Sequence, residues 1–371
     1  QEELNDQMQI RRDKLAEYEA DGIYPFGQRF VVKDHAKDIK NDFLNYEDQP
    51  VVIAGRLMTM RSHGKTAFAN IRDLSSDIQV YFRKDVLGED NYKYVKMLDI
   101  GDIVGIEGHV FKTHSGEVTI KVNKLTLLSK ALRPLPEKWH GLKDTELRYR
   151  QRYVDLIVNP EVRDTFIKRS KIVAKIREYM MNDGFMEVET PMMHPIPGGA
   201  AARPFITHHN ALDIDIYMRI APELYLKRLI VGGMERVFEM NRCFRNEGID
   251  NRHNPEFTTI ESYQAYGDVE DAIRLTENLV SYCAQEVLGT QEITYQGTEI
   301  NLTPPWNRIT MAEGVKKYTG EDFDAVTTVE EARAIADRLN VEYTDNDGIG
   351  KILNACFEDY VEENLIQPTI V

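Results

Sequence analysis

Cysteine is scarce in this chain, and its three thiols lie far apart. They are Cys243, Cys283 and Cys356, an odd number with neither a CxxC pair nor a metal-binding spacing. These features argue against a fold built on disulfide bonds, and a reducing cytoplasm is the simplest setting. No apolar run approaches the length of a membrane span, and no signal peptide precedes the first expected helix. We therefore expect a cytoplasmic protein without a membrane partner.

Positive charge is also in short supply, because 46 Lys and Arg stand against 61 Asp and Glu, a net charge of −15. The imbalance is uneven. Residues 311–371 hold 5 basic against 14 acidic residues, whereas residues 51–130 hold 12 against 9, a balance of +3. A polyanion such as a nucleic acid would therefore bind the mildly basic segment 51–130 more readily than the acidic remainder of the chain. A length of 371 residues with 42% hydrophobic composition allows two globular domains.

The N-terminal third of the chain is expected to form a small barrel. After a helix over 2–20 and a turn-rich lead-in to residue 50, five strand-like runs follow, with a helical stretch between the third and the fourth. This order is typical of an OB-fold barrel over 51–132. The expected strands are 51–60, 66–73, 77–82, 101–111 and 117–128, and the helix is 85–97.

Period-two alternation assigns the two faces of the second and third strands. If small and aliphatic residues such as Ala67 and Ile78 fill the barrel, then Phe68, Gln79 and Tyr81 point outward. OB barrels bind single-stranded nucleic acid on this face by stacking bases on aromatic rings. The alternative is that two aromatic residues are exposed without a function.

A linker is expected over 133–152, where two prolines, a glycine and alternating charges argue against a packed core. Three arginines in or beside it could touch RNA backbone or pair with neighbouring acids, and the second reading is preferred. The arginines are Arg148, Arg150 and Arg152, and the acids are Asp144 and Glu146.

The remaining residues, 153–371, are expected to form a second domain. Pro160 at a first helical position and the Asn182-Asp183-Gly184 stop predict a long helix, which a strand follows. Residues 212–220 alternate, which predicts that Leu212, Ile214, Ile216, Met218 and Ile220 point inward. Further helices are expected over 268–288, 328–340 and 349–363, the last two within the acidic segment 311–371.

The most informative stretch of the chain reads as strand, polar loop, strand over 236–265. Alternation places Phe257, Glu261 and Tyr263 on one face of the second strand. The first strand ends in an arginine, and the loop contains Arg252 and His253, which suit the phosphates of a nucleoside triphosphate. The aromatic ring of Phe257 suits stacking on the base. The alternative is an ordinary antiparallel hairpin with a charged loop.

Three segments carry a family resemblance along nearly all of the chain. They are KALRPLPEKWHGLKDTELRYRQRYVDL, ARPFITHHNALDIDIYMRIAPELYLKRL and FRNEGIDNRHNPEFT. The last resembles the motif 2 hairpin of class II aminoacyl-tRNA synthetases, and together they resemble the bacterial class IIb lysyl-tRNA synthetases. The resemblance implies an α+β protein of two domains: an OB-fold barrel that binds the anticodon, then a catalytic domain with an antiparallel sheet flanked by helices.

The resemblance also implies an activity and its residues. Lysine would be activated by ATP, with Mg²⁺, to lysyl-adenylate and transferred to tRNA(Lys), within a homodimer built through the motif 1 region around the helix that begins at Pro160. Arg245 would be catalytic and would contact both substrates. ATP would also contact Glu247, Arg252, His253, Asn254 and Phe257; lysine would contact Gly199, Glu223, Glu261 and Tyr263; the anticodon would contact Arg61, Phe68, Gln79 and Glu117.

The sequence departs from the family at one place. The third motif, a GxGxGxxR segment, does not occur, so the catalytic domain is expected to be incomplete and the Mg²⁺ ligands to lie beyond Val371, with none in this chain. We therefore expect the chain as written to make adenylate poorly. The alternative is a catalytically incomplete fragment or a synthetase-derived RNA-binding or regulatory protein. The missing C-terminal segment favours this alternative, whereas the intact hairpin residues disfavour it.

Overall fold

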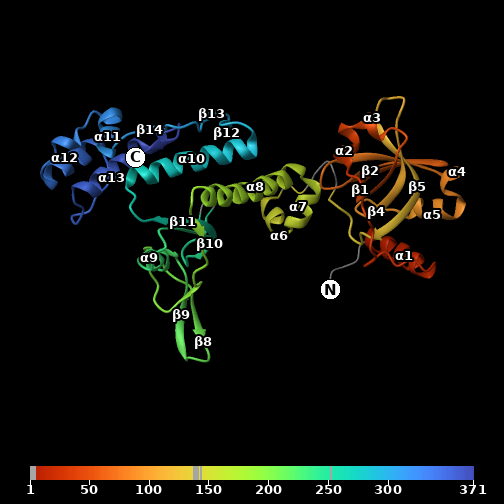
Figure 1. The fold of residues 1–371 in the computed structure, drawn as a ribbon, viewed down its shortest axis with the longest axis horizontal. Coiled ribbons are helices and arrows are strands. Elements are labelled where there is room, and N and C mark those ends of the chain that lie inside the picture. Colours follow the sequence, from red (N-terminus) through yellow and green to blue (C-terminus); the bar gives the residue numbers. More distant parts are fainter. Residues whose placement is uncertain (1–5, 137–141, 143, 251–252) are drawn as a thin grey trace. The chain divides into compact units, whose positions relative to one another are not determined.

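The computed structural model describes residues 6–136, 142, 144–250 and 253–371. The chain divides into two compact units, Gln1–Arg163 and Asp164–Val371, and each is described by itself (Figure 1). No helix within the described ranges is long and apolar enough to cross a membrane.

The first unit contains the predicted five-stranded barrel, closed in the order β1-β2-β3-β5-β4. The expected helix between the third and the fourth strand is divided into α4 and α5 at Gly88, whose φ of 80° is accessible to glycine at little cost. The bounds are β1 Pro50–His63, β2 Thr66–Arg72, β3 Asp77–Arg83, α4 Lys84–Leu87, α5 Glu89–Met97, β4 Ile103–Lys112 and β5 Val118–Ser129.

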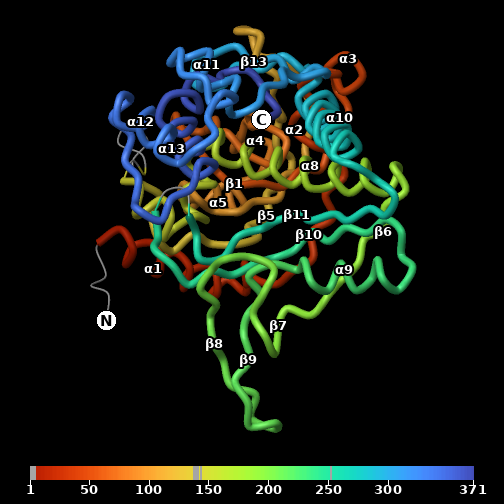
Figure 2. The backbone as a smooth tube through the Cα atoms, turned by 90° about the vertical axis from the view of Figure 1, so that its left-hand side faces the viewer, coloured from red at the N-terminus to blue at the C-terminus, as the bar shows by residue number. Residues whose placement is uncertain are grey.

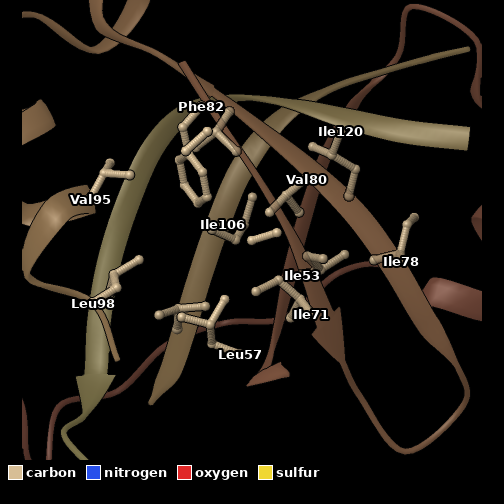
Figure 3. Packing of buried hydrophobic residues seen from close by; sticks show 14 of the residues in the cluster. Ile53, Leu57, Ile71, Ile78, Val80, Phe82, Val95, Leu98, Ile106 and Ile120 are labelled. Carbon is tan, nitrogen blue, oxygen red and sulfur yellow. The ribbon is translucent and has the colours of Figure 1, made fainter. Parts of the chain in front are cut away.

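Aliphatic and aromatic side chains fill the barrel, as the alternation predicts. Figure 3 shows Phe82, Ile106 and Ile120 pointing toward one another from three different strands, and all three are fully buried. Ala67 and Ile78 are buried as well, so Phe68 and Tyr81 lie on the outer side of their strands. The predicted register of β2 and β3 is confirmed.

A buried charge cluster fastens the N-terminal helix α1 (Asp6–Ala20) to this barrel. The Lys130 ammonium, fully buried, lies 2.9 Å from Asp102 and 2.5 Å from Asp99. Asp99 also pairs with Lys14 of α1 at 2.7 Å, and Arg11 donates to the Ala131 carbonyl at 2.9 Å. Helices α2 (Ala36–Asn41) and α3 (Phe43–Tyr46) complete the lead-in.

The expected linker is more ordered than its composition suggests. Residues 137–141 and 143 lie outside the described residues, but helix α6 (Thr145–Arg150) forms directly after them. Asp144 caps this helix by accepting a hydrogen bond from the Leu147 amide. A capped turn of helix satisfies backbone donors that an extended linker would leave to water.

Acidic partners hold all three arginines of this region, so the preferred reading was correct, although two partners differ. Arg150 pairs with Glu146 at 2.6 Å. Arg148 and Arg152 both pair with Asp155, a fully buried carboxylate of helix α7 (Arg152–Val158), rather than with Asp144. A buried carboxylate requires such partners, whereas Asp144 is committed to its cap.

A three-stranded sheet organises the second unit, in the order β11-β10-β6. Strands β10 (Arg236–Phe244) and β11 (Glu256–Gln264) are antiparallel, and β6 (Met186–Glu187) is parallel to β10. Helices α8 (Pro160–Asn182) and α10 (Val269–Leu288) cover one face through a cluster that includes Met180, Phe238 and Leu275. The opposite face carries the polar side chains of the hairpin.

A second sheet, β7-β9-β8, ends in a hairpin that extends away from β10 and β11 (Figure 2). Here the inward alternation holds only in part. Ile216 and Ile220 are buried, but Leu212 and Ile214 are 64% and 43% exposed, so their predicted orientation is wrong. Both residues lie near the tip of the hairpin, where the described chain leaves their side chains open to solvent. Bounds are β7 Met193–His194, β8 Ile206–His209, β9 Ile214–Met218 and, after them, helix α9 Glu223–Val231.

The acidic C-terminal segment is a small helical cluster with its own core of apolar side chains, among them Val315, Ile335 and Phe357. The two predicted helices are present, and α11 precedes them with a capping box at Thr310 that the sequence interpretation did not use. The elements are β12 Glu292–Tyr295, β13 Thr298–Asn301, β14 Asn307–Arg308, α11 Met311–Thr319, α12 Val329–Leu339, α13 Ile349–Tyr360 and β15 Thr369–Ile370.

Replacing Phe82 by alanine should destabilise the barrel by about 3–5 kcal/mol, because the change removes a fully buried ring and leaves a cavity. Denaturant unfolding of the protein measures this loss. Phe68→Ala is the matched control, since that ring lies on the outer face, and it should cost far less. Equal losses in the two variants would contradict the assignment of the faces.

Candidate functional site

The polar face of the β10–β11 hairpin gathers the residues that the sequence singled out. Cys243 is opposite Phe257, Glu239 is opposite Glu261, and Val237 is opposite Tyr263. Paired residues in an antiparallel ladder share a face. The predicted common face of Phe257, Glu261 and Tyr263 is therefore present. Cys243 is buried on this face, and desolvation raises its thiol pKa to about 11.

Arg245 occupies one end of this face. Its guanidinium carbon lies 5.1 Å from the centre of the Phe257 ring, and its backbone amide donates to the Pro255 carbonyl at 2.8 Å. The Nε donor is buried and has no hydrogen-bond partner within the described residues. Because a buried unpaired donor is costly, this end of the site suits a ligand that carries an anionic acceptor.

Carboxylates gather at the other end. The Tyr263 hydroxyl donates to Glu261 at 3.3 Å. Burial raises the pKa of Glu261, and the charges of Glu223 and Glu239 raise it further. The hydrogen bond from Tyr263 and the charge of Arg245 lower the pKa, but they do not outweigh these effects. Burial and Glu261 likewise raise the pKa of Tyr263. A cation placed here would relieve this repulsion, so this end suits an ammonium group.

Gly199 brings a backbone segment against Glu223. Its φ is +91°, and a Cβ at this position would lie 3.1 Å from the Glu223 Cβ and 3.2 Å from the Ala221 Cβ. A side chain would be strained and crowded there, so glycine is required for this approach. The predicted loop therefore passes beside the acidic end of the site.

A buried ion pair that the sequence interpretation missed lies beneath the acidic end. Arg219 and Glu239 are both buried, and their charged groups are 2.7 Å apart. Glu239 also accepts from the Thr190 hydroxyl at 2.6 Å, and Arg219 donates to the Arg242 carbonyl at 2.8 Å. The sequence carried one signal for this pair. Strand alternation places Glu239 on the same face as Val237 and Cys243, and a charge on a buried face requires a partner.

The loop between the strands contains the other expected nucleotide ligands. Glu247 accepts from the Arg203 amide at 3.2 Å, beside a hollow that both residues line. His253 contacts Asp250, with its Nδ1 2.7 Å from a carboxylate oxygen, and Asn254 is exposed. Arg252 lies outside the described residues. The described residues of the loop, His253 and Asn254 among them, therefore offer exposed hydrogen-bonding groups.

A second candidate site lies on the outer face of the barrel. Phe68 is 37% exposed and stacks on Tyr81, with ring centres 4.3 Å apart. Gln79 accepts from the Thr119 hydroxyl at 2.8 Å. Arg61 is paired with Phe68 across β1 and β2, and exposed Glu117 lies just before β5, where its amide donates to Thr113 at 3.0 Å.

Metal ligands are not grouped in the part of the chain that the structure describes, where no cluster of three or more His, Cys, Asp or Glu could hold an ion. His208 contacts Asp213 and Asp215 instead, each at 3.2 Å. The described residues therefore do not fit the Mg²⁺ that the resemblance implies.

Comparison with known families agrees with this architecture. A family model for class II tRNA synthetases (D, K and N) matches residues 144–353. A model for OB-fold nucleic acid binding domains matches residues 51–128. The barrel and the hairpin site therefore define a class II aminoacyl-tRNA synthetase.

Relatives narrow the family further. Lysine–tRNA ligase of Thermoanaerobacter pseudethanolicus is 57% identical over 371 residues, which is 100% of this chain and 74% of the relative. The ligase of Carboxydothermus hydrogenoformans is 57% identical over 100% of this chain and 76% of its own length. The ligase of Oceanobacillus iheyensis is 55% identical over 100% of this chain and 76% of its own length. The chain therefore belongs to the lysine–tRNA ligase family.

Replacing Glu261 by glutamine should raise the melting temperature at neutral pH. The raised pKa means that the fold favours the protonated carboxyl, whose stabilising contribution is present below about pH 4.3, the ordinary value, and is lost as pH rises through the folded pKa. Glutamine does not ionise. Thermal unfolding should therefore show a gain at about pH 7 that shrinks near pH 4.

Glu363→Gln is the control, because Glu363 is exposed in the C-terminal helical cluster, away from the hairpin. This variant should show no comparable gain at either pH. A Glu261→Gln advantage that is the same at both pH values would show that the carboxyl charge is not repelled at this site.

Proposed function

We propose that this protein activates lysine with ATP to give lysyl-adenylate and then transfers the lysyl group to the 3′ end of tRNA(Lys). The single observation that carries this proposal is the pairing of opposite environments on one hairpin face. Glu261 and Tyr263 of the hairpin form an acidic end together with Glu223 of helix α9, and Arg245 with Phe257 forms a cationic and aromatic end. An amino acid with a positively charged side chain suits the acidic end, and a nucleotide suits the cationic and aromatic end.

The acidic end suits the two ammonium groups of lysine. Glu261 and Tyr263 face each other at 3.3 Å, which suits the ε-ammonium, and Glu223 beside Gly199 suits the α-amino group. A buried ammonium requires a carboxylate and directed acceptors. We propose that the side chain is selected by charge, because an uncharged analogue would leave Glu261 unpaired.

The opposite end suits the reacting phosphate. Arg245 would hold the α-phosphate and the lysine carboxylate, while Phe257 would stack on the adenine and Glu247 and Asn254 would bind the nucleotide. The lysine carboxylate then attacks the α-phosphorus, and pyrophosphate leaves. The step needs positioning and charge neutralisation more than acid–base chemistry, which is consistent with the unpartnered Arg245 Nε among the described residues.

The barrel suits the anticodon. Phe68 offers a ring for base stacking, Gln79 offers an amide for reading a base edge, and Arg61 and Glu117 lie at exposed positions. The charge balance of +3 over residues 51–130 moderates the repulsion that a net charge of −15 would otherwise exert on RNA. Binding of tRNA(Lys) through this face is part of the proposal.

A homodimer through the motif 1 region is also proposed. Helix α8 and the strand that follows it expose apolar side chains, including Ile172, Met181 and Met186. Exposed apolar residues on one helix–strand unit are a common feature of subunit interfaces.

In a full-length version that includes the third motif, replacing Arg245 by alanine should abolish lysine-dependent ATP–pyrophosphate exchange. The expected loss is about 3 kcal/mol or more, because a charge-assisted contact to the reacting phosphate is removed. Arg245→Lys keeps the charge without the planar fork and should retain part of the activity. Exchange by the alanine variant within tenfold of wild type would remove Arg245 from its proposed role.

Replacing Phe68 by alanine should weaken tRNA charging by about tenfold, because stacking contributes roughly 1–3 kcal/mol per base. Pyrophosphate exchange needs no tRNA and should be nearly unchanged, so the two assays separate the two sites. Equal damage to both steps would mean that Phe68 supports folding. An effect on neither step would mean that the ring is exposed without binding RNA.

A further inference from the structure

The acidic end of the site already contains a cation that belongs to the chain. Lys227 lies one turn after Glu223 on helix α9, and its ammonium is 2.6 Å from a Glu223 oxygen. The same ammonium is 5.9 Å from the centre of the Tyr263 ring. The side chain of Lys227 therefore extends toward two of the groups that are proposed to receive the substrate.

The contact between Lys227 and Glu223 matters because of the other charges around it. Within the described residues, Lys227 is the only cation that forms an ion pair with Glu223, and Glu261 forms no ion pair. Glu239 is different, because buried Arg219 holds it in an ion pair at 2.7 Å. Removal of Lys227 would therefore leave Glu223 without an ion-pair partner among the described residues, beside Glu261, whose pKa the charge of Glu223 already raises.

Exposure makes Lys227 a displaceable partner rather than a fixed one. Its side chain is 55% exposed, whereas that of Glu223 is 30% exposed. A long side chain with its ammonium near water turns outward at little cost, since exposed ion pairs are weak. Arg219, at 3% exposure, has no such freedom.

We propose that Lys227 is an internal placeholder that occupies Glu223 in the free protein and is displaced by an ammonium group of the substrate. The inference rests on the proposed function, because it assumes that Glu223 receives lysine. Lys227 acts through Glu223 and is therefore a positioning residue. It keeps the carboxylates apart and correctly oriented before lysine binds, and it competes with lysine for the same oxygen.

A competing explanation is that the pair only supports helix α9, as many glutamate–lysine pairs four residues apart do. The two explanations differ in one measurable respect. A helix-supporting pair contributes the same stability with and without lysine. A placeholder contributes stability only while the site is empty, because the substrate takes over its role.

The test is Lys227→Met, which keeps the length of the side chain and removes the charge. Lysine should bind about two- to fivefold more tightly by calorimetric titration, which corresponds to the strength of an exposed ion pair. The melting temperature should fall without lysine and match that of wild type at saturating lysine. Lys227→Arg restores a cation and should return the lysine affinity toward that of wild type.

Lys351→Met is the matched control, because Lys351 pairs with Asp347 at 2.5 Å with the same spacing of four residues in the C-terminal helical cluster. It should lower the melting temperature equally with and without lysine and leave lysine affinity unchanged. Unchanged or weaker lysine binding by Lys227→Met, or a stability loss that persists at saturating lysine, would overturn the placeholder role alone. Absence of lysine binding by the wild-type protein would overturn the proposed function as well.

Discussion

The buried ion pair between Arg219 and Glu239 is the interaction on which the rest of the site depends. Arg219 follows β9, and Glu239 lies in the middle of β10, so the pair joins the two sheets of the second unit at 2.7 Å. Breaking either partner would leave an uncompensated buried charge, which is far more costly than a lost surface contact. Glu239 of this pair is also directly opposite Glu261 in the ladder. One residue therefore both joins the two sheets and adds a carboxylate to the acidic end of the site.

Opposite charges at the two ends of one hairpin then follow from ordinary strand geometry. Side chains two residues apart share a face, so Phe257, Glu261 and Tyr263 form a row, and Arg245 continues the neighbouring strand past its last paired residue. A rigid antiparallel ladder sets their separations without help from loops. Among the described residues of the loop between the strands, His253 contacts Asp250.

Local periodicity predicted much of this arrangement, and long-range pairing accounts for what it did not predict. Alternation identified the barrel faces and the row on β11, because a period of two is a property of neighbouring residues. It could not show that Arg219 is the partner of Glu239, or that Asp155 holds Arg148, since these contacts depend on where distant segments meet. It was wrong for Leu212 and Ile214 because the hairpin extends beyond any covering layer.

The pairing of β14 with β15 has a consequence for how the C-terminal helical cluster relates to its host. Asn307 is opposite Thr369, and Arg308 is opposite Ile370, so the chain leaves the sheet and returns to the neighbouring position after the helices α11, α12 and α13. An excursion whose ends meet, and which has a core of its own, behaves as an inserted module. Because its core is its own, such a module can carry a charge balance that differs from that of the rest of the chain, while the register between β14 and β15 is kept.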